Sequence, residues 1–380
     1  MPWAVKTITE ENAMKQDREK GSDRVSLDKS WQEIDRIDEE LISLLTKRQS
    51  VSNEIGKLKR ALGLQAIDPA HEQETLRRLA KMSHEKLSPE AIRSIFNEIN
   101  SAARSVQKTP VVAFLGPEAT FTHQAALNLF GHSVSFHAAE TIEEVFSVVE
   151  KGLCHQGVVP IENSYEGSVN RTLDLFYQYD LTISAETSSR IRHHLLSRAG
   201  HRSDIKRLYS HPMAIAQCRS WLSTHLTGVS VEEVASTALG AKMASDEPDA
   251  AAIGGRLAGQ TYGLKILEEN IEDASENFTR FLVIGKGESK PTGQDKTSIL
   301  FLLRHRPGAL HRVLGAIADR GINLTRIESR PMKTGNWEYL FFVDLEGHEK
   351  ESHVSEAIKK METDCIFIKR LGSYPAGNSS

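Results

Sequence analysis

The sequence has little that would place the protein in a membrane or outside the cell. No apolar run approaches the roughly 18 residues of a membrane-spanning helix, and the N-terminus lacks the apolar stretch of a signal peptide. The 3 cysteines are far apart and form no C-x-x-C pair, which argues against a disulfide framework and a cysteine zinc site. The net charge is -4 without a basic stripe, so neither nucleic acid nor anionic lipid is an expected partner. We expect a cytoplasmic protein whose partners are small molecules or copies of itself.

The chain has enough length and apolar content for several domains. It has 380 residues, against a prior of roughly 150 per domain, and is 39% hydrophobic and 26% charged, as globular proteins are. The hydrophobic period changes twice along the chain, which indicates domain boundaries. We expect a disordered tail (1–27), a helical domain (28–108), an α/β domain (109–285), a linker (286–296) and a smaller domain (297–374).

The first segment predicts a long helix. Apolar residues recur every three or four positions over residues 34–58. A helix over residues 28–62 would be roughly 50 Å long at 1.5 Å per residue, too long to bury its apolar stripe inside a small monomeric domain. The pattern therefore implies a partner chain. Two further helices are expected to start at Asp68-Pro69 and Ser88-Pro89, because a capping residue precedes a proline at the first helical position.

The rest of the chain predicts two different α/β arrangements. From Val111 on, short apolar strands alternate with helices, and the length suggests two lobes. The helix at residues 141–150 carries a capping-box pattern, Thr141 with Glu144. The last segment has the order βαββαβ of a ferredoxin-like sandwich. The expected strands of the lobes are residues 111–115, 157–160, 181–185, 205–209, 250–253 and 278–284.

Two cations lie on or beside the apolar stripe of the first helix. Arg48 falls between Leu44 and Val51, and Lys59 follows Ile55 by four positions. They either reach solvent along the edge of the stripe or bind anions. Both readings stay open on spacing alone.

The helical segment resembles the chorismate mutase family. The motifs are I-D-x-I-D-x-x-L (34–41), L-x-x-R (45–48), G-K-x-K (56–59) and D-x-x-x-E (68–72). In that family two intertwined chains form the sites, and a dianion rearranges while cations clamp its carboxylates. The resemblance implies substrate binding by Arg48, Lys59, Asp68, Glu72 and Gln107. Three positions depart from the family pattern, with Trp31 and His71 in place of arginines and Ala103 in place of a serine.

Residues 111–285 resemble prephenate dehydratases in five ordered motifs, LGPEATFTHQAAL, PIENSYEGSVNRTLDLF, YSHPMAIAQC, STALGA and NFTRF. The resemblance implies that prephenate loses carbon dioxide and its ring hydroxyl to give phenylpyruvate, with Thr279 as proton donor. From spacing alone, Thr279 is an ordinary strand threonine. The implied substrate lining is Asn163, Ser164, Gln217, Ser236, Thr237, Arg280 and Phe281, with Glu162 and His211 as candidates that could equally be structural.

No cofactor or metal is expected. The adjacent His193 and His194 point to different faces of any strand or helix, and no cluster with metal-ligand spacing is visible.

The last segment resembles ACT domains in R-P-G-A-L (306–310) and E-S-R-P (328–331). The resemblance implies that phenylalanine binds at a subunit interface and shifts the enzyme toward a less active state. Without it, the glycine is a turn and the other residues pack a dimer. The implied effector site is Gly308, Ala309, Leu310, Glu328, Ser329, Arg330 and Pro331.

Together the resemblances imply a homo-oligomer, dimer or tetramer, of phenylalanine biosynthesis that acts on chorismate and prephenate. Three alternatives remain: an arogenate dehydratase, a dehydratase whose mutase-like helices only dimerise, and a catalytically silent phenylalanine sensor.

Overall fold

The computed structural model describes residues 3–62, 67–82, 86–107, 110–274, 276–303, 306–331 and 339–377. The chain divides into two compact units, residues 1–62 and 63–380, and each is described by itself.

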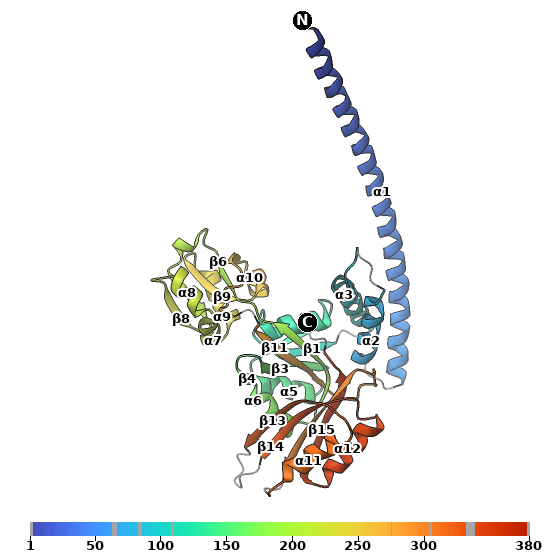
Figure 1. The fold of residues 1–380 in the computed structure, drawn as a ribbon, viewed down its shortest axis with the longest axis vertical. Helices are drawn as coiled ribbons and strands as arrows, with labels where there is room; N and C mark the ends of the chain where they lie inside the picture. The colour runs from blue at the N-terminus through green and yellow to red at the C-terminus, as the bar shows by residue number, and fades with distance from the viewer. Residues whose placement is uncertain are drawn as a thin grey trace. The chain divides into compact units, whose positions relative to one another are not determined.

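The first unit is one helix, α1 (Trp3–Ala61), of 59 residues (Figure 1). It begins 25 positions before the start that we expected at residue 28, so the expectation of a disordered tail is not met. Residues 3–27 contain no proline, and 8 of these 25 residues are Lys, Glu or Arg, which favour helix even without an apolar stripe. The predicted stripe itself is open to solvent in the single chain, with Leu41 50% and Leu44 64% exposed.

The second unit begins with α2 (Pro69–Ala80) and α3 (Pro89–Gln107). Both predicted starts are confirmed: Asp68 Oδ1 accepts from the His71 amide at 3.2 Å, and Ser88 Oγ accepts from the Ala91 amide at 3.2 Å. These helices pack on the next domain, where Asn97 Nδ2 donates to the Asn128 carbonyl at 2.8 Å.

The first α/β lobe is a mixed sheet in the order β2-β1-β3-β11-β5, with β4 paired to β3. Strand β11 comes from the far end of the domain and runs antiparallel to both β3 and β5. It therefore lies between β3 and β5, which both precede the second lobe in the sequence. The elements are β1 (Val111–Leu115), α4 (Phe121–Phe130), β2 (Ser135–Ala139), α5 (Ile142–Glu150), β3 (Gln156–Asn163), β4 (Gly167–Ser168), α6 (Asn170–Gln178), β5 (Thr182–Arg190) and β11 (Phe278–Gly285).

The capping box predicted for α5 is only half formed. Thr141 Oγ1 accepts from the Glu144 amide at 3.1 Å, as expected. Glu144 Oε2, however, accepts from the Glu140 amide at 2.7 Å, one residue before the cap.

The second lobe inserts between β5 and β11 as a sheet in the order β10-β6-β9-β7-β8. Two lobes are thus confirmed, although the strands β2, β4, β6, β8 and β10 were not predicted. The elements are β6 (His194–Ser197), a 3₁₀ turn (Arg202–Asp204), β7 (Arg207–Ser210), α7 (Pro212–Gln217), α8 (Arg219–His225), β8 (Ser230–Glu233), α9 (Thr237–Asp246), β9 (Ala250–Gly254), α10 (Arg256–Tyr262) and β10 (Lys265–Glu268).

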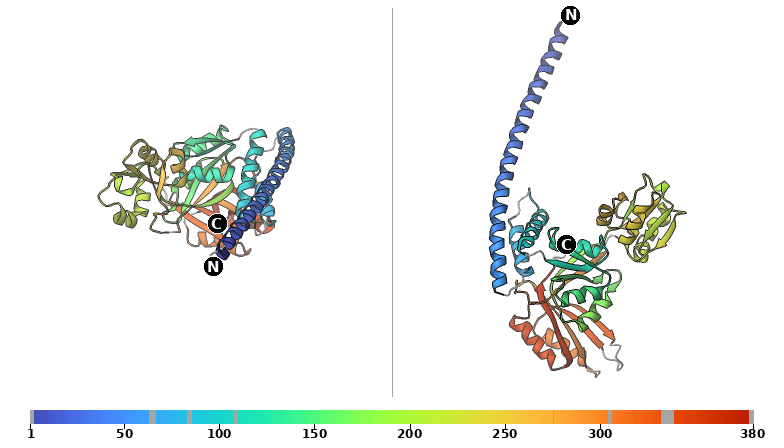
Figure 2. Two further views of the ribbon diagram at one scale, coloured as in Figure 1. Left: turned by 90° about the horizontal axis from the view of Figure 1, so that it is seen from above. Right: turned by 180° about the vertical axis from the view of Figure 1, so that it is seen from behind.

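The last domain has the predicted βαββαβ order and an antiparallel sheet β13-β14-β12-β15. Helices α11 and α12 lie together on one face of this sheet (Figures 1 and 2). Its other face shares one hydrophobic core with the first lobe, where Leu300 and Phe342 pack in a cluster with Phe146, Phe176 and Leu282. The segment that we expected to be a linker therefore joins two domains that are packed together. The elements are β12 (Asp295–Leu303), α11 (Ala309–Ala318), β13 (Leu324–Pro331), β14 (Tyr339–Glu346), α12 (Ser352–Glu362) and β15 (Cys365–Pro375).

Within the ranges that the structure describes, no helix is long and apolar enough to span a bilayer.

Candidate active site

Thr279 on β11 lies beside Asn163, the last residue of β3, and the strand register pairs the two. Asn163 Nδ2 donates a hydrogen bond to Thr279 Oγ1 at 2.9 Å. Asn163 Oδ1 accepts from the amides of Tyr165 at 2.9 Å and Glu166 at 3.2 Å, which fixes the orientation of the side-chain amide. Because Thr279 Oγ1 is already an acceptor, its own proton remains available to a ligand.

A line of hydrogen bonds carries this pair into the second lobe. Asn163 Nδ2 also donates to Asn277 Oδ1 at 2.9 Å, and Asn277 Nδ2 donates to Gln217 Oε1 at 2.9 Å. Gln217 lies at the end of α7, so the line crosses from the strands of the first lobe to the second. The sequence named Gln217 but assigned no role to Asn277, although the NFTRF motif begins there.

His193 completes this line. Its Nε2 lies 2.8 Å from Gln217 Oε1, which places the ring proton on Nε2. Burial lowers the pKa of His193, since the side chain is 2% exposed, and the hydrogen bond with Gln217 only partly opposes this. The imidazole is therefore neutral at pH 7. Its ring also packs nearly perpendicular to that of Phe121, at the start of α4, with 5.5 Å between the centroids.

Other expected residues of the site act on the backbone. Ser164 Oγ donates to the Glu276 carbonyl at 3.1 Å and accepts from the Phe278 amide at 3.0 Å, which fixes the start of β11. Ser236 Oγ caps α9 by accepting from the Leu239 amide at 3.0 Å, and Thr237 is the buried first residue of that helix. In the structure, Ser236 therefore has the local role of a helix cap.

His211 of the second lobe interacts electrostatically with Glu166 of the first lobe. His211 caps α7, its Nδ1 accepting from the Met213 amide at 3.3 Å. Glu166 lies in the turn after Asn163. Burial raises the pKa of Glu166, and the nearby His211 partly opposes this rise. Glu166 was missed because it lies in a loop with no periodic signal.

Arg280 and Phe281, expected in the substrate lining, lie outside this group, and so does Glu162, for which a structural role was the equal alternative. Side chains alternate along a strand, so a Thr279 that faces Asn163 turns Arg280 to the other face of the sheet. There Arg280 and Glu162 meet residues of the C-terminal domain. Phe281 is 1% exposed and belongs to the core with Val112 and Phe114.

The expected mutase residues of the second unit lie on α2 and α3. Asp68 caps α2, and Glu72 Oε2 accepts from Arg104 Nη1 at 2.5 Å. Arg104 is buried and its Nη2 also donates to the Phe130 carbonyl at 2.6 Å, so it ties Glu72 to the dehydratase-like lobe. Arg104 belongs to none of the motifs of the helical segment and was not predicted. Arg48 and Lys59 lie on α1 in the other unit, and the side chain of Gln107 lies outside the described residues.

The expected effector residues lie at the start of α11 and along β13. Gly308 has φ +75, Ala309 is buried, and Leu310 packs on the core of the C-terminal domain. Glu328 Oε2 accepts from Ser168 Oγ at 2.5 Å, and Arg330 Nη2 donates to Asp174 Oδ2 at 3.2 Å. Both of these side chains therefore contact the first lobe. Ser329 and Pro331 are exposed.

The fold and site define a class: a two-lobed α/β enzyme, with a polar site at the lobe junction, that joins mutase-like helices to a ferredoxin-like regulatory domain. Three family profiles match in that order, chorismate mutase type II at residues 31–108, prephenate dehydratase at 112–289 and the ACT domain at 297–363.

Relatives match over most of this chain and almost all of their own length. A bifunctional chorismate mutase/prephenate dehydratase of Aquifex aeolicus is 47% identical over 347 residues, covering 90% of this chain and 96% of the relative. One from Stutzerimonas stutzeri is 42% identical over 348 residues, covering 90% and 95%. The crystal structure of a prephenate dehydratase from Arthrobacter aurescens in complex with L-Phe is 35% identical, with a TM-score of 0.65 over 70% of this chain and 90% of that one. The chain belongs to the family of bifunctional chorismate mutase/prephenate dehydratases.

Proposed function

We propose that this chain converts chorismate to prephenate in its helical domain and prephenate to phenylpyruvate between the lobes, under control by phenylalanine. Family membership supports both activities. The observation that carries the second reaction is the hydrogen bond from Asn163 to Thr279.

The dehydration needs one proton at the departing hydroxyl. When the ring carboxylate leaves as carbon dioxide, its electron pair enters the ring, the ring becomes aromatic, and the hydroxyl leaves as water after taking the proton. Thr279 donates that proton from Oγ1, and solvent later restores it. A threonine hydroxyl is a weak acid, so the donor on Asn163 matters: it stabilises the negative charge that develops on Oγ1.

Thr279→Ala tests this proposal. Phenylpyruvate formation should collapse while the variant still binds prephenate, and Thr279→Ser should keep part of the activity. Thr363→Ala, an exposed threonine at the end of α12, is the matched control. Unchanged turnover in Thr279→Ala would reject the assignment. Arogenate should be assayed beside prephenate, because a higher kcat/KM for arogenate would make the protein an arogenate dehydratase.

For the mutase reaction we propose that Arg48 and Lys59 clamp the carboxylates while Glu72 and Gln107 contact the hydroxyl and the ether oxygen. The family pattern has arginines at the positions of Trp31 and His71. Each charged hydrogen bond contributes roughly 1.5–3 kcal/mol, so we expect this chain to stabilise the transition state less than members that have these arginines. Chorismate consumption with product identification is the test. If prephenate is consumed but chorismate is not, the helices are a dimerisation scaffold.

We further propose a homodimer formed through α1, and phenylalanine binding by the effector residues. The length of α1 and its exposed apolar stripe support the first, since such a face is stabilised by burial against a second chain. The match to the ACT domain supports the second. Light scattering after size exclusion measures the dimer, and calorimetric titration with phenylalanine measures the binding. The cytoplasmic location stays a prediction.

A further inference from the structure

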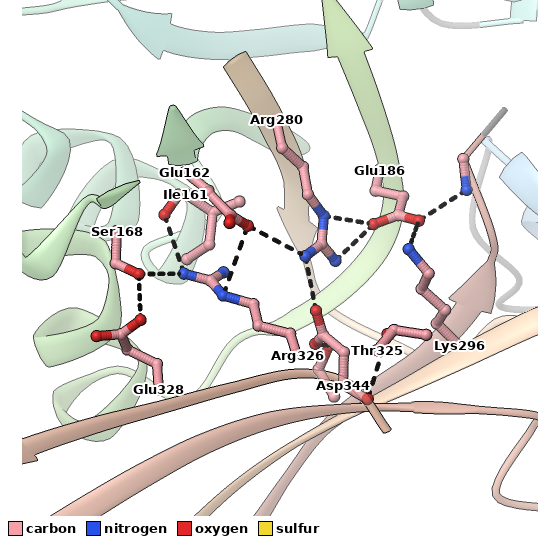
Figure 3. A network of polar contacts seen from close by, with 12 residues as sticks. Ile161, Glu162, Ser168, Glu186, Arg280, Lys296, Thr325, Arg326, Glu328 and Asp344 are labelled. Atoms are coloured by element: carbon pink, nitrogen blue, oxygen red, sulfur yellow. Dashed lines mark hydrogen bonds and ion pairs between the residues drawn. The ribbon is translucent and has the colours of Figure 1, made fainter. Parts of the chain in front are cut away.

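The residue after Thr279 is held by both domains. Arg280 lies on the face of β11 opposite Thr279, and Figure 3 shows its guanidinium between a carboxylate of β5 and one of β14. Both carboxylates are buried, Glu186 being 6% and Asp344 0% exposed. Arg280 donates to Glu186 Oε2 at 2.6 Å, Asp344 Oδ2 at 2.7 Å and the Tyr374 hydroxyl at 3.3 Å.

Arg280 and Glu186 stay charged at neutral pH. Burial lowers the pKa of Arg280, but the charges around it, Asp344 first, raise it above the usual range. Burial raises the pKa of Glu186, and Arg280 and Lys296 more than reverse this. Removal of the Asp344 charge would leave Arg280 held by Glu186 and Tyr374 alone, and because a buried charge that loses a partner is strongly unfavourable, the guanidinium would move or draw in water.

A second set of contacts joins the C-terminal domain to the end of β3, where Asn163 lies. Arg326 of β13 donates through Nη2 to Ser168 Oγ at 2.7 Å and to the Ile161 carbonyl at 3.4 Å, and its Nε lies 3.6 Å from Glu162 Oε2 (Figure 3). Ile161 and Glu162 precede Asn163 on β3, and Ser168 is on β4, which pairs with β3 after the turn. Arg326 is 9% exposed. It therefore holds the β3–β4 hairpin from the side opposite the site.

We propose that Asp344 and Arg326 of the ACT domain are positioning residues for the dehydratase reaction, holding the strands that bring Asn163 and Thr279 to hydrogen-bond distance. Neither residue touches the site. Asp344 acts through Arg280, the neighbour of Thr279, and Arg326 acts through the hairpin that ends in Asn163. The inference depends on the role of Thr279 proposed above.

The same contacts give the effector motif a direct route to the site. Glu328, in the E-S-R-P motif, accepts from the Ser168 hydroxyl to which Arg326 donates. A ligand that binds Glu328 and breaks its hydrogen bond with Ser168 removes one of the contacts that fix the β3–β4 hairpin. Phenylalanine inhibition should therefore depend on Arg326 and Ser168 even though Ser168 belongs to the other domain.

The test compares kcat and KM for prephenate in Asp344→Asn and Arg326→Gln, with and without phenylalanine. A misplacement near 1 Å costs roughly 100-fold in rate, so we expect kcat to fall about 10- to 100-fold while KM changes less than about 3-fold. Arg326→Lys should recover part of kcat. Arg370→Gln is the control, because it breaks ion pairs to Glu362 at 2.9 Å and to Glu349 at 3.8 Å, both within the C-terminal domain.

A fall in kcat only in the first two variants, with a weakened phenylalanine response, supports the proposal. Variants that fold, as judged by circular dichroism, and retain kcat within about 2-fold overturn it. Should Asp344→Asn fail to fold, Ser168→Ala serves instead, because this half-buried serine loses both its contacts to β13 at little cost in packing. Full activity in Thr279→Ala would reject the proposed function itself; an inactive Thr279→Ala beside normal Asp344→Asn and Arg326→Gln rejects only the positioning.

Discussion

Asn277 Nδ2 donates to Gln217 Oε1 at 2.9 Å, and this hydrogen bond joins the two lobes beside the pair Asn163 and Thr279. Asn277 is 2% exposed and also accepts from Asn163, so its side chain has a partner in each lobe. The bond makes the geometry of the site depend on how the lobes are held together.

Asn277→Ala should lower both activity and stability. The substitution removes two hydrogen bonds, the one that Asn163 donates to Asn277 and the one that Asn277 donates to Gln217. At about 0.5–1.5 kcal/mol each, their loss costs about 1–3 kcal/mol in the free energy of unfolding, although Asn163 keeps Thr279 and Gln217 keeps His193 as partners. Phenylpyruvate formation should fall at least about 10-fold, because Asn163 is no longer held from both lobes. Urea unfolding and the prephenate assay measure the two effects. Asn128→Ala, an exposed asparagine on α4, should change neither, and equal losses in the two variants would contradict the argument.

Substitutions of Asn163 test whether Thr279 Oγ1 donates its proton to the substrate. Asn163→Ala removes the donor to Thr279 Oγ1, and loss of one such donor typically costs about 100- to 1,000-fold in kcat. Asn163→Asp keeps the shape but places an acceptor there, so the Thr279 hydroxyl would donate to the carboxylate rather than to the substrate. We expect both variants to be nearly inactive with prephenate at pH 7.5. An active Asn163→Asp would mean that the proton does not come from Thr279.

The sequence was most informative where the determinant is local. Asp68-Pro69 and Ser88-Pro89 predicted the starts of α2 and α3, because a cap and a proline act within one turn. Strand β8 was missed because all of its residues are exposed, so it has no alternation of apolar and polar positions. The start of α1 was missed because residues 3–27 have no apolar stripe, and a polar segment of this kind looks the same in the sequence whether it is helical or disordered.

For the site, motifs located the pair Asn163 and Thr279 but could not say which way their neighbours face. Arg280 was expected at the substrate, yet its partner Asp344 lies 64 positions later in another domain. Nothing in the local pattern of the strand reports a charge at that distance. The same holds for Arg326 and Ser168, which are 158 positions apart.

His193 should make stability fall in mild acid. Its pKa is lowered from 6.5 in the folded protein, chiefly by burial, so below pH 6.5 the unfolded chain binds a proton that the folded chain does not. Stability is fully present above pH 6.5 and is lost as the pH falls through the lowered pKa, with a slope of at most about 1.4 kcal/mol per pH unit. His193→Gln keeps a neutral donor near Gln217 and should flatten this slope. The urea midpoints of both proteins at pH 7.5 and 5.5 measure it, and parallel declines would show that other histidines cause the loss.

Gly372 should be intolerant of a side chain because β15 passes so close to β5. Its φ is +121, and a Cβ there would lie 2.7 Å from the Ile183 carbonyl oxygen. Gly372→Ala therefore combines backbone strain with a clash between the ACT domain and the first lobe, and we expect a loss of about 2–4 kcal/mol in the free energy of unfolding. Gly293→Ala is the matched control, since Gly293 has φ +80 but nothing within 4 Å of the added Cβ, so it bears only the strain. The difference between the two variants in urea unfolding isolates the contact between the domains, and equal losses would show that the close approach contributes nothing.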